Sequence, residues 1–183
     1  MNNDFVQKTS IDGLLVLKRP KHGDDRGFFK EIFHLNEIEE VLNLEFKIVQ
    51  VNHTFSKKGV LRGIHAEQWN KLIYPINGEV FIAIVDMRPD SQTFKKVETF
   101  TINETDRFAL FIPKGLGNSY VVTSEEPVDY IYLVDAYYDG SDQTAIAWDD
   151  PDVNINWPIQ NPIISERDKN NPRLRDLFPE KFK

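Results

Sequence analysis

Apolar residues along this chain come in short runs rich in Val, Ile, Phe and Tyr, and they seldom recur with the 3.6-residue period of a helix. Such β-branched and aromatic runs predict strands. We expect strands at 14–17, 46–52, 71–76, 80–87, 96–102, 108–112, 119–123 and 130–138. Strands at roughly ten-residue spacing, without helices between them, are typical of an antiparallel β-sandwich or barrel.

Turn and helix signals complete this pattern. Asn77-Gly78 lies between two apolar runs and predicts a tight β-hairpin. The segment 36–43 predicts a short helix with Asn36 as its N-cap. A turn or two of helix is expected within 165–178, where Pro172 and Pro179 limit its length.

Composition narrows the class of protein. With 183 residues the chain is expected to form one domain over 1–183, and 40% hydrophobic and 12% aromatic residues are enough for a core. The formal net charge of −7 argues against nucleic acid or an anionic membrane as a partner. There is no cysteine, which excludes disulfides and thiolate chemistry. No stretch reaches about 18 apolar residues, so we expect a soluble, cytoplasmic protein.

Candidate chemistry is densest in the segment 59–71. Arg62 and His65 are three residues apart and Lys71 follows a short turn. In a regular strand Arg62 and His65 would face opposite ways, unless a bulge at Gly63 turns one of them. A lone strand histidine is often only a satisfied polar residue, so this pattern alone leaves the role of His65 open.

One interpretation of this segment is a metal-binding cupin, a jelly-roll protein that holds its ion with three His and one Glu. Gly59 and His65 fit that spacing, but Glu67 stands at the second His position and Asn118 at the later one. One imidazole and one carboxylate are too few to hold a transition metal well. We therefore predict neither a metal nor another cofactor.

A second interpretation comes from motifs spread over the chain. They are Asp25-Arg-Gly-Phe-Phe-Lys-Glu31, Gln50-Val-Asn52, Gly59-Val-Leu-Arg-Gly-Ile-His65, Lys71-Leu72, Ile112-Pro-Lys-Gly115, Tyr137-Tyr138, Trp148-Asp-Asp-Pro151 and Ser165-Glu-Arg-Asp168. In this order they resemble the dTDP-4-dehydrorhamnose 3,5-epimerase family, over about residues 25–168. The resemblance implies an all-β, cupin-type jelly roll (a double-stranded antiparallel β-helix) with a few short helices.

The resemblance also implies a metal-independent isomerase. It would epimerise C3, C5 or both in a nucleotide-diphosphate 4-keto-6-deoxysugar, or a 4-ketoheptose, for surface polysaccharides such as lipopolysaccharide. Moving a proton beside a ketone needs a base, an acid across the sugar plane and a cation near the enolate oxygen. The family pattern assigns these roles to His65, oriented by Asp168, to Tyr138 and to Lys71.

The same pattern implies the substrate-binding residues. Gln50, Asn52, Arg62 and Asn118 match positions that face the ligand in their own subunit. Arg26, Phe29 and Glu31 match residues that reach the nucleotide from a neighbouring subunit, so the resemblance implies a homodimer that exchanges strands.

Two departures bear on the substrate. After the catalytic His, the best-known dTDP enzymes read HYQ and then a longer loop, whereas this chain reads His65-Ala66-Glu67 and reaches Lys71 sooner. Asn118 replaces a histidine of the family and cannot supply its charge or proton. The nucleobase, the sugar and the epimerised carbon therefore stay open. So do a 3,4-ketoisomerase and a non-catalytic sugar-nucleotide binding protein as alternatives.

Overall fold

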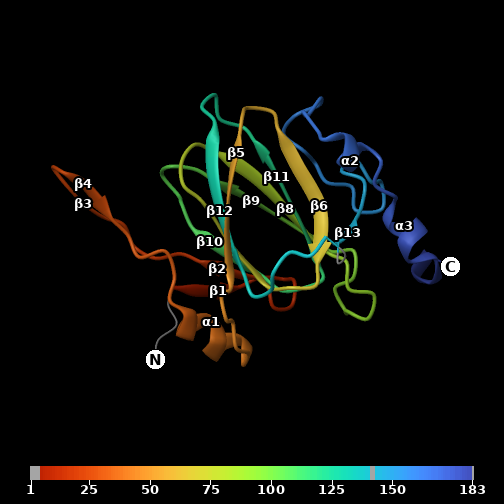
Figure 1. Cartoon of the computed structure of the whole chain (residues 1–183), viewed down its shortest axis with the longest axis horizontal. Coiled ribbons are helices and arrows are strands. Elements are labelled where there is room, and N and C mark those ends of the chain that lie inside the picture. The colour runs from red at the N-terminus through yellow and green to blue at the C-terminus, as the bar shows by residue number, and fades with distance from the viewer. Residues whose placement is uncertain (1–4, 141–142, 183) are drawn as a thin grey trace.

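A computed structural model describes residues 5–140 and 143–182 of the chain (Figure 1). Two antiparallel sheets carry most of the fold. The first has the strand order β1 (Val6–Lys8), β2 (Leu15–Leu17), β10 (Ala109–Ile112), β7 (Lys71–Pro75), β12 (Val128–Val134) and β5 (Gln50–Ser56). The second has the order β13 (Gln143–Ala145), β6 (Leu61–Glu67), β11 (Leu116–Val122), β8 (Val80–Asp86) and β9 (Val97–Ile102). These facing sheets confirm the predicted all-β jelly roll.

The main core lies between the two sheets. Ile73 and Leu110 from the first sheet pack with Ile82, Ile84 and other apolar residues of the second, all fully buried. The strands that supply them, β7, β8 and β10, are buried along almost their whole length. This explains why those runs read as nearly continuous apolar sequence.

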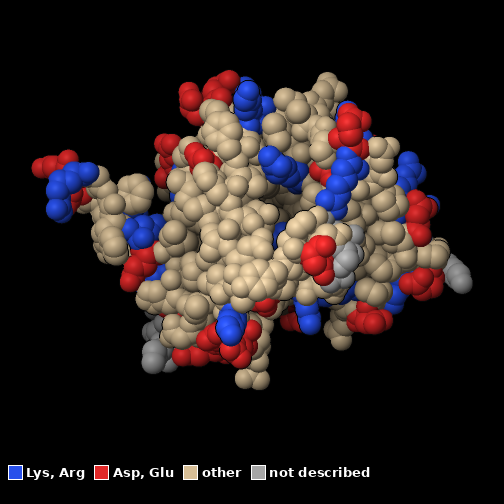
Figure 2. Space-filling model, in the orientation of Figure 1, with Lys and Arg blue, Asp and Glu red and all other residues tan. Residues whose placement is uncertain are grey.

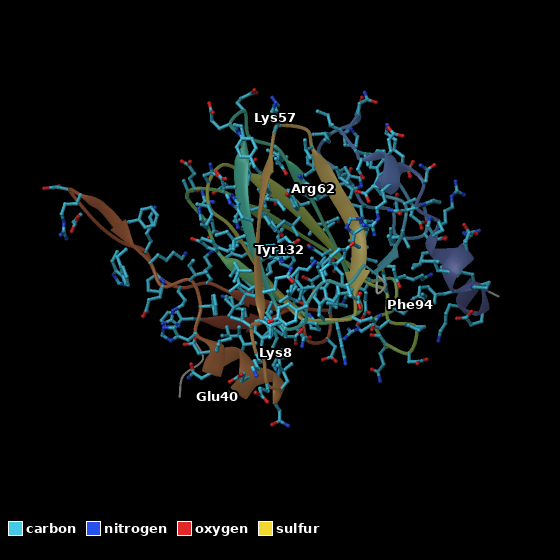
Figure 3. The ribbon with its side chains drawn as sticks, viewed as in Figure 1. Lys8, Glu40, Lys57, Arg62, Phe94 and Tyr132 are labelled. Carbon is cyan, nitrogen blue, oxygen red and sulfur yellow. The ribbon has the colours of Figure 1, made fainter. Side chains whose placement is uncertain are left out.

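The helices are short and lie outside the sheets. They are α1 (Leu35–Leu42), α2 (Glu166–Lys169), α3 (Leu174–Leu177) and the 3₁₀ turn η1 (Pro179–Phe182). Phe94, labelled in Figure 3, packs edge-on against Phe178 and Phe182 and so ties the C-terminal segment to the barrel. No helix in the described part of the chain is long and apolar enough to cross a membrane.

Asn36, predicted as the N-cap of the first helix, is not the capping residue. The N-cap is His34, which makes no side-chain capping bond, and Asn36 lies inside the first turn. The helix starts one residue earlier because Leu35 packs on the outer apolar cluster of the first sheet. Glu39 on this helix accepts a hydrogen bond from the Phe46 backbone amide at 3.0 Å.

The hairpin predicted at Asn77-Gly78 is also wrong. The strands on either side, β7 and β8, belong to different sheets, so this turn carries the chain around a corner of the barrel. Asn77 bonds to the start of β12 instead: its Oδ1 accepts from the Asp129 backbone amide at 2.6 Å. A turn motif fixes the local bend, but it does not decide which strands pair.

Some strand boundaries also differ from the prediction. β5 begins at Gln50, because Phe46 is buried against Phe111 under the sheet rather than paired in it. β12 ends at Val134, and the exposed Tyr137 and Tyr138 follow it.

A separate two-stranded hairpin projects from the barrel. Its strands are β3 (His22–Asp24) and β4 (Gly27–Phe29), and they pair only with each other. Figure 1 shows this hairpin reaching away from both sheets, on the side opposite the C-terminus. Phe28 and Phe29 on it are 64% and 67% exposed, which is unusual for two adjacent large apolar side chains.

Candidate active site

The candidate active site lies at one open end of the barrel, between β6 and β12. A cavity of about 490 Å³ lies there, and the residues lining it include Arg62, His65, Lys71, Asn118 and Asp168. A second cavity of about 190 Å³ adjoins it and is lined by Gln50, Asn52 and Tyr138, among others. Glu67 and Tyr132 line both, so the two cavities share a wall. Figure 2 shows a hollow on the viewed face with basic side chains beside it.

A bulge in β6 brings Arg62 and His65 to the same cavity. His65 pairs with Asn118 of β11, but Arg62 pairs with Tyr120, so three residues of β6 span two of β11. Gly63 makes this possible, since its φ is +128° and a Cβ there would lie 2.4 Å from Ser119 Cβ. The bulge anticipated from the spacing is therefore present.

His65 and Asp168 form a close hydrogen-bonded pair in the cavity. The Nε2 atom of His65 lies 2.6 Å from Asp168 Oδ1, and the two side chains are 22% and 6% exposed. Burial alone would raise the pKa of Asp168, but hydrogen bonds from His65, Ser165 and the Gly63 backbone outweigh it, so the net pKa is lowered. Asp168 is therefore ionised and accepts the proton on Nε2, which leaves Nδ1 as the basic nitrogen of the ring.

Ser165 holds Asp168 in place. Its side-chain oxygen accepts from the Asp168 backbone amide at 3.1 Å and caps α2. The backbone around it is tied to β6, since Val60 and Ile163 form a parallel bridge. A carboxylate 103 positions from His65 is thus fixed beside it.

Lys71 lies at the start of β7 and is buried with a counter-charge. Its Nζ donates to Glu67 Oε1 at 2.8 Å, and it lies 5.1 Å from the centre of the Tyr132 ring. Sequence reasoning gave Glu67 no role in the site. The only available signal was that a carboxylate stands where the best-known relatives carry Gln.

Arg62 and Asn118 also line the larger cavity. Arg62 Nε donates to Ser56 Oγ at 3.0 Å, and Figure 3 shows Arg62 and Tyr132 on the open face of the barrel between β12 and β6. Asn118 Oδ1 is buried and has no hydrogen-bond partner among the described residues. The neighbouring Tyr130 is fully buried, and this burial raises its pKa well above the usual value, although the Asn118 side chain partly opposes the shift.

Tyr138 lies on the smaller cavity rather than on the larger one. Its ring stacks edge-on against Trp69 with centroids 6.3 Å apart, and its backbone amide donates to Gln50 Oε1 at 3.3 Å. Gln50 Nε2 in turn donates to Asn52 Oδ1 at 2.8 Å. The structure thus gathers Tyr138, Gln50 and Asn52 on the far side of the wall made by Glu67 and Tyr132.

The three residues expected from a neighbouring subunit are not brought to this cavity. Arg26, at the tip of the hairpin, pairs with Asp24 at 2.5 Å and is 89% exposed at its side chain. Phe29 is exposed on β4, and Glu31 binds Arg19 at 3.0 Å. None of the three lines either cavity of its own chain.

Among the described residues, no group of three or more His, Asp or Glu side chains is arranged to hold a metal ion. The two residues closest to the cupin ligand pattern are already paired, His65 with Asp168 and Glu67 with Lys71. We therefore derive no chemistry through a metal.

Comparison with known proteins decides the family. Residues 8–176 match the sequence profile of dTDP-4-dehydrorhamnose 3,5-epimerase. The chain belongs to the dTDP-4-dehydrorhamnose 3,5-epimerase family. This membership confirms the predicted fold type and the predicted enzyme class, an epimerase among the isomerases.

Individual relatives give the same result. The dTDP-4-dehydrorhamnose 3,5-epimerase of Shigella flexneri is 36% identical over 175 residues, covering 93% of this chain and 96% of its own. A dTDP-6-deoxy-D-glucose-3,5-epimerase from Legionella pneumophila, solved with dTDP-4-keto-L-rhamnose, is 32% identical with a TM-score of 0.87, covering 96% of this chain and 95% of its own. ChmJ, a 3'-monoepimerase of Streptomyces bikiniensis solved with dTDP-quinovose, is 27% identical with a TM-score of 0.87, covering 94% and 90%.

Proposed function

We propose that this epimerase inverts C3, C5 or both in a nucleotide-diphosphate 4-keto sugar by removing and returning a proton. The observation that carries the proposal is the pair of His65 and the buried Asp168, 2.6 Å apart, on the wall of a cavity that also holds Lys71. A 4-keto group makes the hydrogens on C3 and C5 acidic. A neutral imidazole oriented by a carboxylate is the group best suited to remove one near neutral pH.

The proposed steps balance without a further reactant. His65 Nδ1 takes the proton from the carbon beside the ketone, and the electron pair of that C–H bond moves into the enolate. The imidazolium is stabilised by Asp168, and the enolate oxygen by the Lys71 ammonium. Tyr138 then delivers a proton to the opposite face of the carbon, and the ketone forms again. The imidazolium passes its proton to solvent water and the tyrosinate takes one from it, which restores both groups.

Tyr138 serves as the acid in this scheme from its place on the adjoining cavity. The shared wall of Glu67 and Tyr132 supports this, because a sugar that lies along it contacts both cavities. Arg62 suits the diphosphate, since a guanidinium binds phosphate oxygens in pairs. Asn118 suits a sugar hydroxyl, which would bond to its orphan Oδ1.

We further propose a homodimer in which the hairpin of each subunit reaches the cavity of the other. Arg26, Phe29 and Glu31 then supply a cation, a flat apolar surface and a carboxylate for the nucleotide. The exposure of Phe28 and Phe29 supports this, as do the exposed Val51 and Phe55 on β5 at the sheet edge.

The relatives favour a dTDP-linked 4-keto-6-deoxysugar as the substrate. Glu67 and Asn118, which depart from the family motif, keep other nucleotide-linked ketosugars in the proposal, including 4-ketoheptoses. A place in surface-polysaccharide synthesis, a cytoplasmic location and a single domain over the whole chain stay predictions.

Deuterium exchange tests the reaction. The enzyme is incubated in D₂O with dTDP-, GDP-, UDP- and CDP-linked 4-keto sugars, and deuterium at C3 and C5 is followed by mass spectrometry and NMR. Exchange at one or both carbons with retention of the 4-ketone supports epimerisation. A shifted carbonyl would identify a 3,4-ketoisomerase instead, and tight binding without exchange at high enzyme concentration would leave a binding protein.

A further inference from the structure

A carboxylate–ammonium pair lies in the active site beside the His65–Asp168 pair. Lys71 Nζ donates to Glu67 Oε1 at 2.8 Å, and their side chains are 8% and 9% exposed. Glu67 and His65 are two residues apart on β6, at the end of the strand that reaches the cavity. Two hydrogen-bonded pairs, His65–Asp168 and Lys71–Glu67, thus lie next to each other in one cavity.

The burial of Lys71 makes its counter-charge necessary. An ammonium taken out of water without a partner releases its proton more readily than an exposed one. In the described part of the chain, Glu67 is the carboxylate that bonds this ammonium. The nearby carboxylate of Asp135 accepts from Asn70 instead, at both its backbone amide and its side chain.

We propose that Glu67 is a positioning residue that keeps the Lys71 ammonium protonated and aimed at the junction of the two cavities. The inference rests on the proposed function, in which Lys71 stabilises the enolate oxygen. The Tyr132 ring, 5.1 Å from Lys71 Nζ, forms the other side of this seat. A neutral amide at this position could accept the hydrogen bond, but it could not balance the charge.

Other titratable groups share these cavities, so the test must separate them from Lys71. They are Arg62 and His65 on β6, Tyr120 on β11, Tyr130 and Tyr132 on β12, Tyr138 after it, and Arg167 and Asp168 on α2. All of them are present in both wild type and Glu67→Gln. The ratio of the kcat of Glu67→Gln to that of wild type at each pH therefore cancels the effect of titrations that the substitution leaves unchanged.

The first experiment measures kcat and KM of wild type and Glu67→Gln from pH 6 to 9. We expect the ratio of variant to wild-type kcat to fall by about tenfold as the pH rises over this range, because a buried ammonium without its counter-charge releases its proton more readily than a paired one. Glu67→Asp restores a carboxylate and should keep its own ratio constant with pH. Glu79→Gln is the matched control, since Glu79 is half-buried and bonds Thr123 outside both cavities.

The second experiment needs no substrate and reads the pair directly. The ¹³Cε signal of Lys71, identified as the one that Lys71→Arg removes, is followed by NMR over the same pH range. It should stay constant in wild type and titrate in Glu67→Gln. A pH-independent kcat ratio together with an unchanged signal would overturn the proposal. Absence of deuterium exchange in wild type would instead remove the proposed function, while the NMR result would still report on the pair.

Discussion

The cavity and the projecting hairpin are built in opposite ways. In the cavity, His65 is paired with the buried Asp168, and Lys71 with the buried Glu67. In the hairpin, β3 and β4 bond only to each other, and two phenylalanines face outward. The residues proposed for catalysis are thus gathered within one chain, whereas those expected to bind the nucleotide lie on a hairpin whose apolar side chains are left exposed.

The largest expected effect comes from removing His65, and it should lower kcat without changing nucleotide binding. His65→Ala removes the proposed base and should lower kcat by about 10²–10⁴, or about 3–5 kcal/mol of barrier. Binding of the nucleotide should change little, because the hairpin and Arg62 are untouched. Steady-state kinetics and a thermal-shift titration with the nucleoside diphosphate measure the two effects. A variant that keeps more than a tenth of wild-type kcat would contradict the role of His65.

The next prediction tests which chain the hairpin serves. The double variant Arg26→Ala, Phe29→Ala should lose most activity, as His65→Ala does. Co-expressed, the two variants should recover roughly a quarter of wild-type activity, because half of randomly formed dimers are mixed and each holds one intact site.

The alternative result of that mixing is equally clear. If each hairpin served its own cavity, every chain in the mixture would still carry one lesion, and activity would stay at background. Size-exclusion chromatography with light scattering on each variant is the control, since both must remain dimeric for the mixing to be interpreted.

A smaller effect is expected at Tyr138, which lines the smaller cavity, and it separates proton removal from inversion. Tyr138→Phe removes the proposed acid but leaves His65 and Lys71 in place. Deuterium exchange should continue within about tenfold of the wild-type rate, while formation of the inverted product falls by about 10²-fold or more. NMR of the product separates the two rates. Equal loss of exchange and inversion would mean that Tyr138 does not act after the first proton transfer.

The smallest expected effect concerns stability in acid. The pKa of Asp168 is lowered in the folded protein, so its ionised form stabilises the fold above the unfolded pKa of about 4, and this contribution is lost as pH falls through the lower folded value. The difference in unfolding free energy between wild type and Asp168→Asn should therefore shrink between pH 5 and pH 3. Urea titrations measure it. A difference that grows on acidification would show that Asp168 is not held as the carboxylate.

How far the sequence predicts this molecule depends on the range of the interactions involved. Apolar runs such as 80–87 predicted strands correctly because side-chain alternation and burial are local properties. The hairpin predicted at Asn77-Gly78 was wrong because strand pairing depends on the packing of the whole barrel, and this turn joins strands of two different sheets. The bulge at Gly63 could be anticipated because a three-residue spacing conflicts with the period of a strand.

The candidate site divides in the same manner. The pairing of His65 with Asp168 came from a family resemblance, since nothing local links residues 103 positions apart. The place of Tyr138 on the smaller cavity could not be seen in sequence, because it follows from where β12 ends. Glu67 was considered only as a metal-ligand position and as a departure from the family motif, because only the fold shows that it and Lys71 are buried together.

The bulge in β6 has a consequence for how the proposed site would recognise its ligand. Three backbone units now separate the guanidinium of Arg62 from the imidazole of His65 on one side of a rigid sheet. In the proposed binding mode Arg62 contacts the phosphate end of the ligand and His65 its reacting carbon, so the bulge sets the backbone spacing between these two contacts. Substitutions in the surrounding cavity walls would then change which sugar is accepted without changing that spacing.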